Sequence, residues 1–148
     1  MNENMVEIEH LRKSFGNVNA VNDLSFQVKY GELFAFLGIN GAGKSTTISM
    51  ICGQLTADSG TIHVNGQDVR KHSHEIKENI GVVFQDSVQD KPLTARENLK
   101  SRAALYGITG KNFGHRLDEL NKIFDLKEFI DRPVGKLSGG QRRRVDIA

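Results

Sequence analysis

The chain has 148 residues, 38% of them hydrophobic and 26% charged, which is typical of a folded domain rather than of a disordered chain. Its formal net charge of +2 is too small to indicate a nucleic-acid binder, and its single cysteine, Cys52, excludes a disulfide framework and a cysteine metal cluster. No apolar run reaches membrane-spanning length and the first residues do not resemble a signal peptide, so we expect a cytosolic location.

Alternating apolar and polar residues predict two half-exposed strands near the N-terminus. The alternation covers residues 6–11 and residues 24–28, and a turn at Ser14-Phe15-Gly16-Asn17 separates them. Such alternation is typical of an antiparallel sheet with one face in water. A short hairpin is expected over residues 61–69, because Asn65-Gly66 is a favoured two-residue hairpin turn.

Two continuous apolar runs predict strands of a different kind. Residues 33–37 and residues 80–84 are apolar without alternation, as in parallel strands that are buried on both faces. The first run leads directly into Gly38-Ile39-Asn40-Gly41-Ala42-Gly43-Lys44-Ser45-Thr46, and a helical pattern follows. Residues 38–45 have the P-loop spacing G-x-x-x-x-G-K-[ST]. Gln85 stands at the C-terminal end of the second run.

Each residue type in the P-loop has a direct chemical reason. The three glycines, Gly38, Gly41 and Gly43, let the backbone wrap closely around phosphates, so that its N–H groups can donate to them. Lys44 brings a mobile positive charge to the β- and γ-phosphates, and the Ser45 hydroxyl can ligate Mg²⁺. We assign Thr46 to helix packing, with a phosphate contact as the alternative.

The second half of the chain has a helical pattern. Thr94-Ala95-Arg96-Glu97 is a capping box, and helices are expected from there to Tyr106, over residues 113–124 and over residues 126–130. Leu137-Ser138-Gly139-Gly140-Gln141, hereafter the signature segment, then precedes another helix with Ser138 as N-cap. Its bare glycines predict a second anion-binding helix terminus, which requires a second nucleotide or a second subunit.

The P-loop and the signature segment together resemble the ATP-binding domain of ABC ATPases, over the whole length of the chain. The resemblance implies an α/β fold with a P-loop NTPase core, an antiparallel β subdomain and an α-helical insert, incomplete at the C-terminus. Residues 1–92 then form the β subdomain and core, residues 93–136 the insert, and residues 137–148 the signature segment with its helix start.

The resemblance also assigns roles to individual residues. It implies that Phe15 stacks on adenine, and that Gln85 contacts Mg²⁺ and the attacking water. The signature segment would close over the γ-phosphate of ATP bound to the opposite subunit. The residues implied to contact ATP are Phe15, Gly38, Asn40, Gly41, Ala42, Gly43, Lys44, Ser45, Thr46, Ser138, Gly139, Gly140 and Gln141.

The family resemblance further implies partners and a location. Two copies, or this chain and a paired ATPase subunit, would form a head-to-tail dimer around two ATP molecules, at the inner face of the membrane. A membrane permease would be contacted near Gln85 and the helical insert. Residues 88–98 are similar to ATP-binding subunits of exporters of the drug-resistance kind.

The chain departs from the family pattern at its end. Family members continue into a strand ending in an Asp-Glu pair that supplies a metal ligand and the general base, and later into a switch histidine. We therefore expect the complete chain to be an ATPase, and these 148 residues alone to bind ATP weakly and to hydrolyse it negligibly. The neighbours of the missing strand should expose an apolar face.

Two other functions stay open from the sequence alone. One is a soluble ABC-type ATPase that acts on nucleic acid or ribosomes, which the small net charge disfavours. The other is a regulatory module that binds nucleotide without turnover. Individual residues also have simpler interpretations: Phe15 as a half-exposed turn aromatic, Gln85 as a solvated strand end, and residues 142–144 as a solvated basic face.

Overall fold

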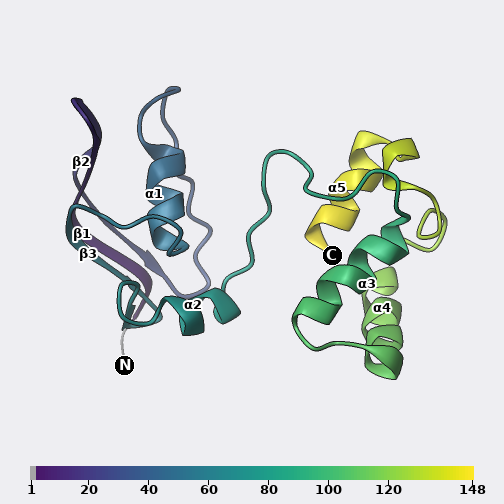
Figure 1. Ribbon diagram of the computed structural model, residues 1–148. Helices are drawn as coiled ribbons and strands as arrows, with labels where there is room; N and C mark the ends of the chain where they lie inside the picture. The colour runs from purple at the N-terminus through teal and green to yellow at the C-terminus, as the bar shows by residue number, and fades with distance from the viewer. Residues whose placement is uncertain (1–2) are drawn as a thin grey trace. The chain divides into compact units, whose positions relative to one another are not determined.

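The computed structural model describes residues 3–148, and these divide into two compact units, residues 3–81 and residues 82–148. The N-terminal unit contains an antiparallel sheet and two helices (Figure 1). The strand order is β2-β1-β3-β4, and β1 pairs with both β2 and β3. The antiparallel sheet predicted from the alternating pattern is therefore confirmed. The elements of this unit are β1 (Asn4–Phe15), β2 (Val18–Lys29), α1 (Lys44–Ile51), β3 (Ser59–Val64), β4 (Gln67–Asp68) and α2 (Ser73–Asn79).

The core of the N-terminal unit lies on one face of this sheet. Residues of β1, β2 and β3 pack there against Met50 of α1 and Ile76 of α2, which are both almost fully buried. Cys52, at the end of α1, is buried as expected, and this burial raises the pKa of its thiol. The buried strand residues of this core are Ile8, Leu11, Val21, Ile62 and Val64.

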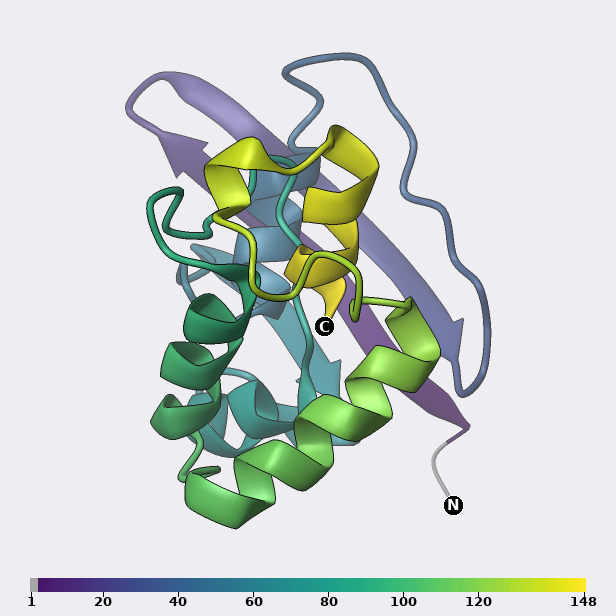
Figure 2. The ribbon, with the colours of Figure 1, turned by 90° about the vertical axis from the view of Figure 1, so that its right-hand side faces the viewer.

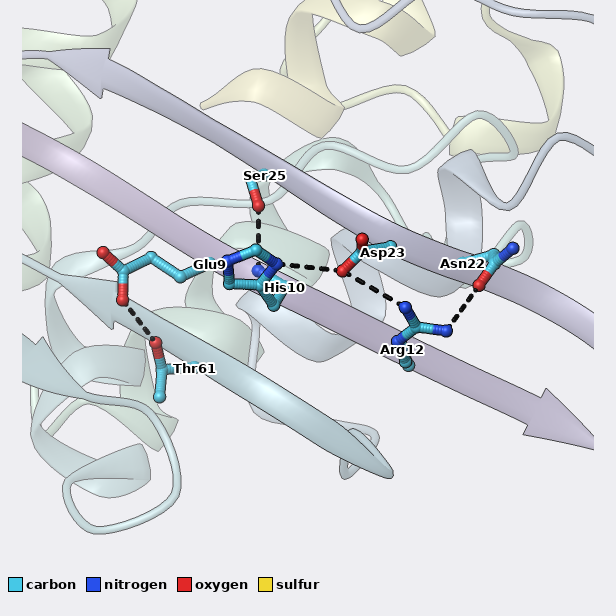
Figure 3. A network of polar contacts seen from close by, with 7 residues as sticks. All are labelled: Glu9, His10, Arg12, Asn22, Asp23, Ser25 and Thr61. Carbon is cyan, nitrogen blue, oxygen red and sulfur yellow. Dashed lines mark hydrogen bonds and ion pairs between the residues drawn. The ribbon is translucent and has the colours of Figure 1, made fainter.

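A bulge interrupts the pairing of β1 with β2. His10 and Asp23 both have positive φ, at 50° and 58°, a conformation that polar residues tolerate better than branched ones. The His10 N–H donates to Ser25 Oγ at 2.9 Å, and His10 Nδ1 lies 3.0 Å from Asp23 Oδ1 (Figure 3). Arg12 bridges Asp23 and Asn22 in the same network. These bonds attach the two strands to each other at one of several register shifts, and the last shift, between Lys13 and Ser14, lies close to the hairpin tip.

The second hairpin has the turn that its sequence predicts. Asn65 and Gly66, between β3 and β4, have φ values of 51° and 75°. Two consecutive positive φ values are the requirement of a type I′ turn, which matches the twist of the flanking strands. The Asn65 N–H also donates to Met5 O at 2.8 Å, which attaches the turn to β1.

The two strands expected from continuous apolar runs are absent, and that prediction is wrong for the described residues. Residues 33–37 and 80–84 are not strands, and in Figure 2 the connection from β2 to α1 is an irregular trace. Within residues 3–148 no strand pairs with either run, and an extended segment without a partner leaves its backbone groups unbonded. Leu33 and Leu37 are 99% and 86% exposed. The rings of Phe34 and Phe36 do stack on Phe26 of β2.

The C-terminal unit is helical and has a core of its own. Its core joins residues of every helix of the unit with those of the connection between α4 and α5. The helix expected over residues 126–130 is wrong, because this stretch forms turns closed by bonds such as Phe129 N–H to Leu126 O. Pro133 follows too closely for a longer helix to form. The helices are α3 (Ala95–Leu105), α4 (Gly110–Phe124), the short 3₁₀ helix η1 (Val134–Lys136) and α5 (Gly139–Ile147).

The capping box at the start of α3 is confirmed. Thr94 Oγ1 accepts from the Glu97 N–H at 3.2 Å, and Glu97 Oε2 accepts from the Thr94 N–H at 2.8 Å. The bonds from the Thr94 N–H and hydroxyl lower the pKa of the Glu97 carboxyl. Thr109 stands at the same position before α4, but its side chain makes no capping bond.

We predict that Thr94→Ala lowers the free energy of unfolding by about 1 kcal/mol, because it removes a side-chain acceptor from the first turn of α3. Thr109→Ala is the matched control and should change it by no more than a few tenths of a kcal/mol. Urea titration followed by far-ultraviolet circular dichroism measures both. Equal losses in the two variants would contradict the importance of the capping box.

A second prediction concerns pH. Because the pKa of Glu97 is lowered in the folded chain, its stabilisation is present above the unfolded value of about 4.3 and is lost as pH falls through the folded value. Glu97→Gln keeps the acceptor but not the charge. Wild type should therefore exceed this variant in stability at pH 7, and the difference should shrink below about pH 4. A difference that stays constant from pH 7 to pH 3 would contradict this.

Candidate functional site

The P-loop forms a tight backbone turn ahead of α1. Gly41 and Gly43 have φ values of 85° and 80°, which side chains rarely permit, so the glycines at both positions are explained. The ammonium group of Lys44 folds back over the loop and donates to Gly38 O at 2.6 Å and Ile39 O at 2.7 Å. Lys44 therefore covers the turn that its neighbours form, where a phosphate would need a positive charge.

Gly43 also brings the loop against β2. A Cβ atom at this position would lie 2.1 Å from the Ala20 carbonyl oxygen, closer than real contacts allow. Only glycine permits this approach without movement of one backbone. A cavity of about 280 Å³ borders the loop, and its lining includes Ala20, Phe36, Ala42, Lys44 and Thr47.

Thr47 is the most buried residue in the first turn of α1. Its side chain is 1% exposed, its hydroxyl donates to Gly43 O at 2.9 Å, and its N–H donates to the same oxygen at 2.8 Å. Thr46 is partly buried, and its assignment to helix packing stays a prediction. The sequence signal for Thr47 was its spacing of four residues from Gly43, which places the hydroxyl over the preceding turn.

The start of α1 suits an anion. Gly43, its N-cap residue, has no side chain to occupy the first N–H groups, and its first turn contains no acidic residue. The unpaired N–H groups and the positive end of the helix dipole therefore stay available to a ligand. Ser45 is exposed in this first turn, so its hydroxyl is accessible to a metal ion beside bound phosphates.

Phe15 lies in the same unit, at the tip of the β1–β2 hairpin. It is 51% exposed and pairs with Val18 across the turn. The ammonium group of Lys13 lies 5.5 Å from the centre of the Phe15 ring. Val18 is two residues before Ala20 on β2, so the hairpin tip stands close to the strand position that Gly43 contacts.

Gln85 lies in the C-terminal unit, exposed, at a bend that follows the irregular run 80–84. The residues around it are attached to α5 by bonds that the sequence did not reveal. Arg143 Nη1 donates to Phe84 O at 2.5 Å, and Ser87 Oγ donates to Asp146 Oδ1 at 2.8 Å. Such long-range pairs have no local sequence signal.

The signature segment begins α5 with a second capping box. Ser138 Oγ accepts from the Gln141 N–H at 3.2 Å, and Gln141 Oε1 accepts from the Ser138 N–H at 3.0 Å. The predicted N-cap role of Ser138 is confirmed. Leu137 is buried in the core of the unit, whereas Gly139 and Gly140 are exposed, with open space where a side chain would begin. The backbone of this first turn is therefore accessible to a ligand or a partner.

The described part of the chain contains neither a cluster of metal ligands nor a membrane-spanning helix. Within residues 3–148 no group of three or more His, Cys, Asp or Glu side chains gathers to hold a metal ion. No helix in the same range combines the length and the apolar character that crossing a membrane requires.

The glycine loop, its lysine and the uncapped start of α1 define a nucleotide-binding P-loop protein. Residues 21–148 match the family model described as "ABC transporter", and the chain belongs to that family. The mixed α/β fold with its antiparallel β subdomain agrees with this: the structure of cbiO1 from Clostridium perfringens, part of the ABC transporter complex cbiONQ, matches with a TM-score of 0.87 at 28% identity. The match covers 99% of this chain and 60% of that one.

Curated relatives are similar over nearly the whole chain. The linearmycin resistance ATP-binding protein LnrL of Bacillus subtilis is 40% identical over 143 residues, which are 97% of this chain and 46% of the relative. The Nod factor export ATP-binding protein I of Ralstonia nicotianae is 37% identical over 144 residues, 97% of this chain and 45% of the relative. The chain thus spans about half the length of these relatives.

The close approach at Gly43 gives a prediction with a control in the same loop. Gly43→Ala should lower the free energy of unfolding about 1–3 kcal/mol more than Gly41→Ala, because both substitutions strain a positive φ but only the first collides with the Ala20 carbonyl. Urea titration of both variants measures the difference. Equal decreases in the free energy of unfolding would contradict this prediction and show that β2 moves away from the added methyl group.

Proposed function

We propose that this chain carries the ATP-binding part of an ATPase subunit that drives export through a separate membrane permease. The main observation behind the proposal is the geometry of the P-loop. Gly41 and Gly43 have left-handed backbone conformations, Lys44 folds over the loop, and helix α1 starts without a side-chain cap. Family membership supports ATP as the ligand. The names of the relatives, which refer to linearmycin resistance and Nod factor export, support export as the process.

Different residues of the loop would contact different parts of a bound triphosphate. The N–H groups of residues 38–46 donate to phosphate oxygens, and Lys44 leaves its two carbonyl partners to neutralise the β- and γ-phosphates. The Ser45 hydroxyl would be one ligand of Mg²⁺, and water molecules and phosphate oxygens would supply most of the others. The metal ion would partly neutralise the negative charge of the phosphates. Phe15 would support the adenine, and Gln85 would orient the attacking water and contact the metal ion.

The signature segment supports a dimeric arrangement. The first turn of α5 is exposed and starts with two glycines, so its N–H groups are accessible. The P-loop of the same chain already supplies donors for one triphosphate, which leaves these N–H groups available to a second nucleotide. In a head-to-tail pair the Ser138–Gln141 turn of one subunit would cover the γ-phosphate held by the other. We further propose residues 1–92 as β subdomain and core, residues 93–136 as helical insert, and a position at the inner face of the membrane through the permease.

Turnover should require more than these 148 residues. Asp146 accepts a hydrogen bond from Ser87, and Asp86 is exposed beside Gln85. Neither residue belongs to a sequence motif that would assign it as the general base. We expect the 148 residues alone to bind ATP weakly and to hydrolyse it negligibly. ATP turnover by this chain that Lys44→Ala abolishes would contradict that expectation.

The test of the proposed function is nucleotide binding. Lys44→Ala should weaken the affinity for a fluorescent ATP analogue by at least about tenfold, because a charged contact to phosphate is worth about 1.5–3 kcal/mol. Lys71→Ala, which removes an exposed lysine from the same unit, should leave the affinity unchanged. Fluorescence anisotropy measures both. Equal affinity of wild type and Lys44→Ala would overturn the proposal.

A further inference from the structure

A carboxylate outside the P-loop holds the hairpin tip that carries Phe15. Asp58 precedes β3, and its two oxygens accept from Lys13 Nζ and from the Ser14 N–H, both at 2.7 Å. The Asp58 N–H donates to Arg12 O at 3.0 Å. Three consecutive residues at the end of β1 are thus bonded to one residue that enters from the segment after α1. The position of the hairpin tip therefore depends on Asp58.

Lys13 transmits this constraint to the aromatic ring. Its side chain is only 15% exposed, and its ammonium group is held between Asp58 and one face of the Phe15 ring. A lysine over a ring is attracted by the electrons of that face. Phe15 is 51% exposed although Lys13 lies over its ring, so part of the ring surface is accessible to a flat partner.

We propose that Asp58 and Lys13 are positioning residues for the nucleotide base: they hold Phe15 so that a planar aromatic base stacks on the ring face opposite Lys13. The inference rests on the proposed nucleotide-binding function and deepens it. It separates two independent parts of one site, the P-loop for the phosphates and the Asp58–Lys13–Phe15 group for the base. Neither Asp58 nor Lys13 needs to touch the nucleotide.

The experiment compares a ligand that has a base with one that has none. Calorimetric titration of the 148-residue chain with ATP and with tripolyphosphate gives both affinities. Asp58→Asn and Lys13→Met should each weaken ATP by about five- to tenfold, the size expected for a lost stacking contact, and should change tripolyphosphate less than about twofold. Lys13→Arg, which keeps a cation over the ring, should retain most of the ATP affinity.

Two controls separate positioning from a general loss of structure. Asp23→Asn removes a carboxylate from another ion pair of the same hairpin and should change neither affinity. In a Phe15→Ala background, Asp58→Asn should cost nothing further, because the ring on which it acts is gone. Unchanged tripolyphosphate binding shows that the P-loop is intact in each variant.

The outcomes are distinguishable. The inference is overturned if Asp58→Asn weakens tripolyphosphate as much as ATP, if it weakens neither, or if its effect persists without Phe15. In those cases ATP binding by wild type still supports the proposed function. If wild type binds neither ligand, the proposed function fails, and the inference fails with it.

Discussion

The close approach of the Gly43 backbone to the Ala20 carbonyl is the contact on which the site depends. It places the P-loop directly on β2, with no side chain between the two backbones. The Gly43 carbonyl in turn accepts two bonds from Thr47, so the loop, the strand and the first turn of α1 are joined at one residue. Because β2 also pairs with the strand that carries Phe15, a single hairpin supports both the phosphate loop and the aromatic ring.

The two helix starts that the sequence singles out are built in opposite ways. Helix α1 begins at a left-handed glycine and has no side-chain cap, so its first N–H groups await an external acceptor. Helix α5 begins with a complete capping box in which Ser138 and Gln141 bond each other. The first turn of α5 is therefore stable without a ligand and presents its glycines in a fixed geometry. Binding of an anion should therefore stabilise the first turn of α1 more than the first turn of α5.

Local sequence signals predicted what local bonds determine. The Asn65-Gly66 turn, the Thr94–Glu97 capping box, the N-cap role of Ser138 and the alternating strands of the N-terminal sheet are all as expected, because each depends on residues a few positions apart or on one buried face. The family resemblance likewise identified the fold class. The Asp58–Lys13 pair and the bonds from α5 to residues 84–87 join distant parts of the chain. No residue spacing in the sequence predicts these contacts.

The apolar runs 33–37 and 80–84 show why a pattern alone does not make a strand. Their composition favours burial on both faces, but a strand also needs neighbours that bond its N–H and C=O groups. In residues 33–37 the aromatic side chains do find a partner, since Phe34 and Phe36 stack on Phe26, whereas Leu33 and Leu37 stay exposed. Side-chain packing on one strand is therefore not sufficient to order this run as a strand. The P-loop that follows it is held from its other end, by Gly43 on β2 and by Thr47 in α1.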